Sequence, residues 1–364
     1  MISLFDPIKL GAINAPNRIL MAPLTRGRSE GVHVPITALK ADYYSQRADA
    51  GLIIAEATGI TQEGSGWPSA PGIWSVEQVE AWKPVTEAVH EAGGRIILQL
   101  WHMGRLVHSD FLGGAAPVSS SATTAPGSAH TGKEKKPYTP ARALGIDEIP
   151  RVIGDYVHAS KNAMAAGFDG VQIHSANGYL IDQFLRDNAN FRDDAYGGPI
   201  ENRIRLLREV AQAVADTVGA DRTSVRLSPN GETQGVNDSN PVPLFTAAAA
   251  ALQSVGIGFL ELREQRNYGD FGKTDVPRVS PEIRKVFTNP LVLNQEYREE
   301  NFHDDLASGL ADAISFGRPY ISNPDLVSRI ARGLPWAGDN MPTWYSSGPV
   351  GYTDYPVANE VVAA

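Results

Sequence analysis

Residues 95–101 read RIILQLW, an apolar run that only Gln99 interrupts and that two glycines, Gly93 and Gly94, precede. A run this short and this apolar is typical of a parallel strand that is covered on both of its faces. Residues 75–92, before the run, and residues 147–166, after it, have the period of an amphipathic helix. We therefore expect a strand that lies between two helices.

The same kind of run recurs along the chain. Seven further strands are expected at Arg18–Leu24, Leu52–Ala57, Gly170–His174, Thr223–Leu227, Phe259–Arg263, Leu291–Asn294 and Ala313–Phe316. Helical period marks residues 38–50, 75–92, 147–166, 200–218, 244–255 and 298–309. A last helix is expected to begin with Asn323 as its N-cap, Pro324 as its first residue and Asp325 in its first turn.

Eight strands that alternate with helices, without a linker-like change of composition, predict one α/β domain over residues 1–364, a single (β/α)8 TIM barrel. The competing doubly wound fold lacks its dinucleotide fingerprint, because Ser69 stands where the third glycine after Gly64 and Gly66 would fall. Residues 102–145 are too many for a plain loop. We expect them to form a long insertion after strand 3, over the C-terminal mouth of the barrel.

Composition excludes several kinds of protein. The 364 residues hold no cysteine, so disulfides, thiolate metal sites and cysteine nucleophiles are absent. The net charge of −9 argues against a nucleic-acid partner, which needs cations for its phosphates. The first residues, MISLFDPIKL, lack the pattern of an export signal, and no stretch is long and apolar enough to span a membrane. We expect a cytoplasmic protein that is monomeric or self-associates weakly.

In a TIM barrel the active site is built from the carboxyl ends of the strands. These ends carry Pro23, Thr25, Gln99, Trp101, His102, His174, Asn177, Tyr179, Arg226, Arg263, Asn294, Gln295, Gly317 and Arg318, among others. No lysine ends a strand, so Schiff-base aldolase chemistry is not indicated. No pair of carboxylates lies at neighbouring strand ends, so glycosidase chemistry is not indicated. The two histidines lack a carboxylate that could join them as a metal ligand, so no metal is expected.

Two polar residues lie inside apolar strands, where they need a partner. Gln99 interrupts IILQLW and Arg226 interrupts SVRLS. Each could meet a ligand or an internal hydrogen-bond partner. Phe316-Gly317-Arg318 follows the eighth strand, where barrels bind phosphate with backbone N–H groups, a helix N-terminus and an arginine. Because the donors of Gln99 and Arg226 suit the edge of a flavin ring, the combination indicates FMN.

The segment from His174 to Leu180, HSANGYL, follows the fourth strand. His174 and Asn177 could donate hydrogen bonds to one carbonyl oxygen, and Tyr179 could donate a proton. The alternatives are a packed histidine, an Asn-Gly turn and a tyrosine that only packs. Three such residues in one loop at a barrel mouth favour a role in binding or catalysis over a purely structural role.

These residues resemble those of the Old Yellow Enzyme family of FMN-dependent ene-reductases, in the branch without cysteine at the position of Thr25. The resemblance covers the whole chain. It is carried by LFDPIKLG (4–11), NRILMAPLTR (17–26), AGLIIAEATGI (50–60), LQLWHMGR (98–105), AGFDGVQIHSANGYLIDQFLRD (166–187), YGGPIENRIRL (196–206), RLSPNG (226–231), ADAISFGRPYISNPDL (311–326) and YTDYP (352–356).

The resemblance implies a role for each site residue. The FMN-binding set would be Pro23, Leu24, Thr25, Ala57, Gln99, Arg226, Gln295, Gly317 and Arg318. His174 and Asn177 would bind and polarise the substrate carbonyl, and Tyr179 would protonate the substrate. Thr25, Trp101 and Tyr345 would shape the substrate pocket. The chain departs from many relatives after the seventh strand, where Gln295-Glu296 replaces a glycine-bearing loop, so the Glu296 carboxylate would have to point away from the phosphate.

The activity implied is reduction of activated alkenes, namely α,β-unsaturated aldehydes, ketones, imides and nitroalkenes. NADPH or NADH would deliver hydride to N5 of a non-covalently bound FMN, and the alkene would then take it up in the same pocket. Two alternatives remain open at this point. They are another FMN-dependent barrel oxidoreductase and a flavin-binding protein without catalysis.

Overall fold

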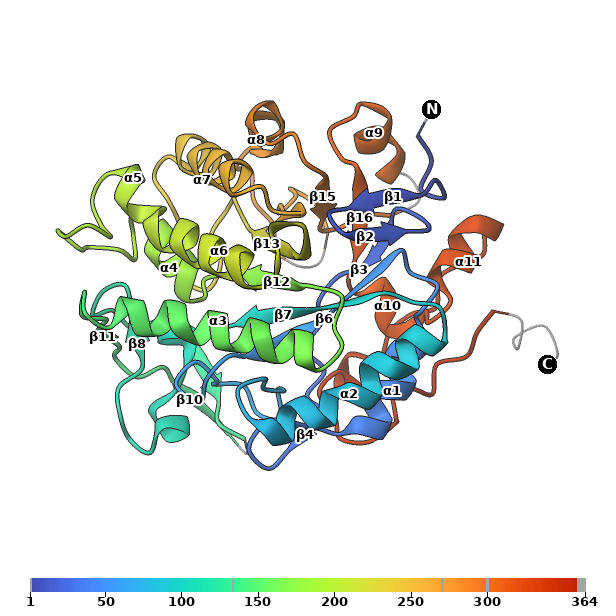
Figure 1. The fold of residues 1–364 in the computed structure, drawn as a ribbon, viewed down its shortest axis with the longest axis horizontal. Helices are drawn as coiled ribbons and strands as arrows, with labels where there is room; N and C mark the ends of the chain where they lie inside the picture. Colours follow the sequence, from blue (N-terminus) through green and yellow to red (C-terminus); the bar gives the residue numbers. More distant parts are fainter. Residues whose placement is uncertain (1, 133, 270–271, 299–300, 359–364) are drawn as a thin grey trace.

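Eight parallel strands close into a barrel, as predicted (Figure 1). The structure, a computed structural model, describes residues 2–132, 134–269, 272–298 and 301–358. The strands, in chain order, are β3 (Ile19–Met21), β6 (Leu52–Gly59), β7 (Ile96–Trp101), β12 (Val171–His174), β13 (Thr223–Leu227), β14 (Phe259–Arg263), β15 (Leu291–Asn294) and β16 (Ala313–Phe316). Each pairs with its neighbours in the chain, and β16 pairs with β3 to close the ring.

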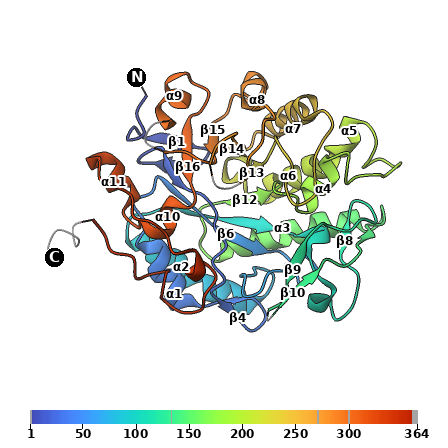
Figure 2. The ribbon, with the colours of Figure 1, turned by 180° about the vertical axis from the view of Figure 1, so that it is seen from behind.

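Helices surround the barrel, and Figures 1 and 2 show α3 and α6 side by side on its outside. The helices that match the predicted segments are α1 (Thr37–Ser45), α2 (Val76–Glu91), α3 (Ile149–Ala165), α5 (Ile200–Arg203) with α6 (Arg205–Val218), α7 (Pro241–Val255) and α9 (Phe302–Ala307). Three helices, α4 (Leu180–Leu185), α8 (Ser280–Val286) and α10 (Pro319–Ser322), were not predicted. In the described part of the chain, no helix has the length and apolar character needed to cross a bilayer.

The predicted start of the last helix at Asn323 is wrong. A short helix, α10 (Pro319–Ser322), follows Gly317-Arg318 directly, and α11 (Leu326–Arg332) begins after Asp325. The Asn323 side chain is used elsewhere: its Nδ2 donates to the Pro319 carbonyl at 2.7 Å, and its Oδ1 accepts from the Ala337 N–H at 2.7 Å. The helix that starts beside Gly317 and Arg318 is therefore α10.

The N-terminal end of the barrel is plugged by a hairpin of β1 (Ile8–Leu10) and β2 (Ile13–Ala15). Leu10 and Ile13 of the hairpin join the apolar residues that point into the barrel, among them Leu20, Ile54 and Ile97. Because this end is filled by hydrophobic side chains, the space for a ligand lies at the opposite, C-terminal end.

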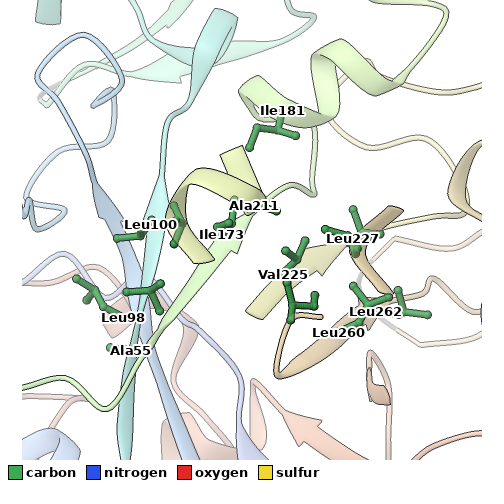
Figure 3. Packing of buried hydrophobic residues seen from close by; sticks show 14 of the residues in the cluster. Ala55, Leu98, Leu100, Ile173, Ile181, Ala211, Val225, Leu227, Leu260 and Leu262 are labelled. Atoms are coloured by element: carbon green, nitrogen blue, oxygen red, sulfur yellow. The ribbon is translucent and has the colours of Figure 1, made fainter. Parts of the chain in front are cut away.

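The outward side chains of the strands pack against the helices and form the main core. Leu98 and Leu100 of β7 and Leu260 and Leu262 of β14 are buried there, as Figure 3 shows, together with Ala211 of α6. Successive strand residues point to opposite faces. Gln99 therefore points into the barrel while its apolar neighbours point outward, which explains the single polar interruption of this strand.

The predicted insertion between β7 and α3 contains β8 (Val118–Ser119), β9 (Ser128–His130), β10 (Lys135–Pro137) and β11 (Arg142–Ala143), on the side of the molecule away from β1 and β2 (Figures 1 and 2). The β9 residue His130 packs against Trp67, with ring centroids 5.3 Å apart. Tyr138 belongs to the same buried cluster as Trp101 and Tyr179. The insertion thus covers part of the C-terminal mouth.

Candidate active site

A cavity of about 740 Å³ opens at the C-terminal end of the barrel. Most of the predicted site residues line it. They are Pro23, Leu24, Thr25, Trp101, Asn177, Tyr179, Arg226, Gln295, Gly317, Arg318 and Tyr345. Ala57, Gln99 and His174 are not among the lining residues and are buried next to them. The strand ends therefore supply much of the cavity wall, whereas Tyr345 was expected there only from the resemblance.

The floor of the cavity rests on a layer of hydrogen-bonded polar side chains centred on Glu261. The Glu261 carboxylate accepts from Gln172 Nε2 at 2.9 Å and from Ser315 Oγ at 2.6 Å. Gln99 Nε2 donates to Gln172 Oε1 at 2.7 Å, so Gln99 has the internal partner that was one of the two alternatives. Polar side chains at this depth are tolerated because they satisfy one another.

Arg226 reaches from this layer into the cavity. Its Nε lies 3.2 Å from Glu261 Oε2, and its Nη2 donates to Asn294 Oδ1 at 2.7 Å. These two contacts fix the guanidinium at the cavity wall. A fixed cation here can stabilise negative charge on a bound group.

His174 ends β12 and is held as a neutral imidazole. Burial lowers its pKa well below the usual 6.5, and the nearby Arg226 and Arg263 lower it further. Its Nδ1 accepts from the Ala176 N–H at 3.4 Å. A neutral ring that accepts at Nδ1 carries its proton on Nε2, so Nε2 is left as a hydrogen-bond donor.

Asn177 lies in a tight turn, with φ of 59°, and Gly178 follows with φ of 80°. The Asn177 N–H donates to Ser228 Oγ at 2.8 Å, and the Gly178 N–H donates to Asp182 Oδ2 at 2.9 Å. The Asn177 side-chain oxygen accepts from Arg263 Nη1 at 3.1 Å. Because Arg263 holds that oxygen toward itself, the Asn177 amide nitrogen faces the other way and can donate there.

Tyr179 stands between two rings. The Trp101 indole lies edge-on to it with centroids 5.0 Å apart, and the His174 imidazole lies edge-on at 4.9 Å. Burial raises the pKa of Tyr179 to about 12. The phenol is therefore protonated at neutral pH and can give a proton away.

The loop after β15 takes a backbone conformation that favours glycine. Gln295 has φ of 97° and Glu296 has φ of 54°. Two consecutive non-glycine residues in the left-handed region are strained. The Glu296 carboxylate lies 3.7 Å from Arg298 Nη2 and packs against Gly269. The chain thus keeps a glycine-like loop shape without a glycine at either position.

Gly317 and Arg318 stand at the start of α10. The N–H groups of Tyr320 and Ile321 donate to the carbonyls of these two residues, which opens the first helical turn. Because α10 begins with Pro319, which has no N–H, and the next two N–H groups are used in the turn, an anion at this point would be held by the backbone at Gly317 and by the Arg318 guanidinium. The Arg318 guanidinium, which lines the same part of the cavity, lies 3.7 Å from Asp339.

The sequence did not indicate how the C-terminal segment reaches the site. Arg26 and Arg28, both buried, donate to carbonyls between residues 343 and 351, including those of Trp344 and Gly351. This segment, which we call the C-terminal strap (residues 343–351), brings Tyr345 to the cavity, where it packs on Trp67 at 5.3 Å. The Arg26 and Arg28 contacts could not be predicted because they join residues more than 300 positions apart.

The donor set fits a flavin with one phosphate. Arg226 and the polar layer beneath it lie at one part of the cavity wall, and Gly317 and Arg318 lie at another. Pro23 and Leu24 supply apolar wall. A cation beside the edge of a flavin ring suits the negative charge that the ring can carry, and an arginine beside a glycine backbone suits a phosphate. Fold and site together define a flavin-dependent barrel oxidoreductase.

Comparison with known proteins agrees with this class. Residues 3–337 match the NADH:flavin oxidoreductase / NADH oxidase family. The 12-oxophytodienoate reductase 2 of Arabidopsis thaliana is 40% identical over 98% of this chain and 96% of its own length. The structure of an old yellow enzyme homologue from Zymomonas mobilis is 60% identical, with a TM-score of 0.96, over 98% of this chain and 99% of that chain. Morphinone reductase in complex with tetrahydroNAD is 40% identical, with a TM-score of 0.92, over 98% of each chain.

The chain belongs to the NADH:flavin oxidoreductase / NADH oxidase family, and it is an FMN-dependent oxidoreductase of the Old Yellow Enzyme type that uses a nicotinamide reductant.

Proposed function

We propose that this protein is an NAD(P)H-dependent ene-reductase of alkenes activated by a carbonyl, imide or nitro group. FMN, when bound, supplies the exchange of hydride between the nicotinamide and the alkene. Pro23, Leu24, Thr25, Ala57, Gln99, Arg226, Gln295, Gly317 and Arg318 would hold it. Relatives named for the reduction of 12-oxophytodienoate and morphinone support this reaction class.

The observation that carries the proposal is a group of three neutral donors, with Asn177 and Tyr179 at the cavity wall and His174 buried against Tyr179. His174 is left with Nε2–H, Asn177 with its amide nitrogen, and Tyr179 with its phenol. The first two would bind the activating oxygen of the alkene. As negative charge grows on that oxygen during the reaction, the two hydrogen bonds strengthen and the transition state is stabilised more than the ground state.

Tyr179 would then donate its proton to the α-carbon of the substrate. Its ring is packed between Trp101 and His174, so the hydroxyl is directed without help from the substrate. Thr25, Trp101 and Tyr345 would shape the space above the ring, and water would be excluded by the aromatic residues of the wall.

The test is a two-step spectroscopic experiment on the FMN-loaded protein without oxygen. NADPH should bleach the flavin absorbance, and cyclohexenone should then restore it with formation of cyclohexanone. A protein that bleaches but is not recoloured by any alkene would be a different flavin oxidoreductase. A protein that does not bleach would be a flavin binder without this activity.

A further inference from the structure

We propose that Arg263 is a positioning residue for the substrate oxygen: it holds the Asn177 carboxamide with its N–H groups toward the substrate and places a positive charge behind them. The inference rests on the proposed function, because it takes the activating oxygen to bind at His174 and Asn177. The family resemblance gave Arg263 no role, although Arg263 is one of the strand-end residues of the barrel.

Strand geometry brings Arg263 to the site. It is the last residue of β14 and follows Phe259 and Glu261 at intervals of two, so it points to the same inward side of the barrel. Phe259 lies in the apolar interior, Glu261 in the polar layer and Arg263 at the cavity wall. β13 separates β14 from β12, so only a long side chain can reach Asn177 from this position.

Two hydrogen bonds fix the Arg263 guanidinium. Its Nη1 donates to Asn177 Oδ1 at 3.1 Å, and its Nε donates to Gln295 Oε1 at 2.9 Å. The guanidinium is planar and rigid, so two anchors determine its orientation. Arg263 therefore connects the loop after β12, which carries the substrate donors, to the strained loop after β15.

The first of these bonds decides which way the Asn177 amide faces. A carboxamide presents an acceptor on one side and two donors on the other. An arginine can only donate, so it selects the orientation with the Asn177 oxygen toward itself. If the amide turned over, its oxygen would face the substrate oxygen and repel it. Arg263 thus makes Asn177 a donor before any substrate arrives.

The charge of Arg263 is not used in a direct ion pair. Within the described ranges, no carboxylate lies within 4.0 Å of its guanidinium, whereas Arg226 has Glu261 at 3.2 Å. Burial and the repulsion of Arg226 lower the pKa of Arg263 to about 10, against the longer-range attraction of Tyr179 and Glu296, so Arg263 is a cation at neutral pH. A hydrogen bond from a cation polarises the amide, which strengthens the bond that the amide donates in turn.

The consequence concerns substrates whose oxygen becomes fully negative. The cation stabilises an anionic oxygen more than a neutral carbonyl, so its effect grows along the reaction. A phenol is a suitable probe, because its oxygen can sit on the same donors and is anionic when ionised.

The experiment titrates FMN-loaded variants with p-chlorophenol and follows the long-wavelength charge-transfer absorbance over a range of pH. Arg263→Met should bind the phenol roughly tenfold more weakly and should need a higher pH to develop half of the band. Arg263→Lys keeps the charge but not the planar fork, so its pH midpoint should stay near that of the native protein while its affinity is intermediate. Arg266→Met, which removes a nearby cation paired with Asp305, is the matched control and should match the native protein.

Native affinity and an unshifted pH midpoint in Arg263→Met would overturn the inference. The double variant His174→Ala/Asn177→Ala keeps this outcome separate from failure of the proposed function: loss of phenol affinity in the double variant would leave that function standing, and retention of affinity would refute it. If Arg263→Met fails to retain FMN, Arg263→Gln takes its place, since it keeps a donor but no charge. It should then show the upward shift of the pH midpoint, and an unshifted midpoint would again refute the inference.

Discussion

The phenol ring of Tyr179 meets the indole of Trp101 edge to face, with centroids 5.0 Å apart and ring planes at 85°. The imidazole of His174 meets the same ring at 79°. Edge-to-face contacts are favoured because the positive ring edge faces the negative ring face. The two neighbouring rings thus set the position of the hydroxyl. A substitution that keeps the Tyr179 ring can therefore test the role of the hydroxyl alone.

Tyr179→Phe should keep both ring contacts and remove only the hydroxyl group with its proton. Reduction of the enzyme by NADPH should be nearly unchanged, and its reoxidation by cyclohexenone should slow by roughly two to four orders of magnitude, the range for a positioned general acid. Stopped-flow absorbance measures the two half-reactions separately. A nitroalkene is the control substrate, because its nitronate product can leave before it is protonated. Equal slowing of both half-reactions would show that Tyr179 only packs or binds.

The pH dependence of reoxidation should reflect the raised pKa of Tyr179. The active form is the protonated phenol, and burial moves its pKa from 10.0 to about 12. The rate with cyclohexenone should therefore stay level as the pH rises through 10 and should fall only as it approaches 12. Single-turnover rates at a series of pH values test this. A decline centred near pH 10 would mean that the phenol titrates as it does in water.

Glu296→Gly should relieve the backbone strain after β15. A residue other than glycine in the left-handed region costs about 1 kcal/mol or more, so the variant should unfold at the same or a higher temperature and release FMN more slowly. Flavin fluorescence during heating measures both changes. Glu296→Ala is the matched control, because it removes the same carboxylate and keeps the strain. If the alanine variant gained as much as the glycine variant, charge and not backbone conformation would be the cause.

Arg28→Met should loosen the C-terminal strap. The Arg28 guanidinium donates to the carbonyls of Thr343, Trp344, Gly348 and Val350. Arg26 or Ser346 also donates to three of these carbonyls, so the variant mainly loses hydrogen bonds from a cation. Hydrogen bonds from a charged group contribute roughly 1.5 to 3 kcal/mol each, and several are lost together, so thermal unfolding should shift clearly downward. Arg151→Met, at an exposed ion pair with Glu63, should change stability by less than about 1 kcal/mol. Equal effects of the two substitutions would contradict the role of the strap.

The fold was predictable because each barrel strand is a short apolar run. All eight were found in the sequence, including β7 with its inward Gln99. The helix α8 was missed because it is short and follows a polar segment, although Ser280-Pro281-Glu282 is a usual helix start. The predicted cap at Asn323 was wrong because tertiary contacts with Pro319 and Ala337 use that side chain.

The sequence predicted which residues lie at the strand ends of the site, but it did not predict which of their side chains contact one another. Asn177 and Tyr179 were placed at the mouth by their position after β12. The contact of Arg263 with Asn177 spans a strand that belongs to neither residue, so it depends on the reach of one side chain and leaves no local pattern. The ring contacts of Tyr179 likewise join three separate positions.

The C-terminal strap has a consequence for how the protein is made. Synthesis proceeds from the N-terminus, so Arg26 and Arg28 leave the ribosome long before their acceptors between residues 343 and 351 exist. Until then both cations lack these carbonyl partners, and the cavity lacks the wall that Trp344 and Tyr345 supply. A nascent chain that has not reached residue 351 therefore presents an open mouth, and firm retention of the flavin becomes a mark of a chain that has passed this point.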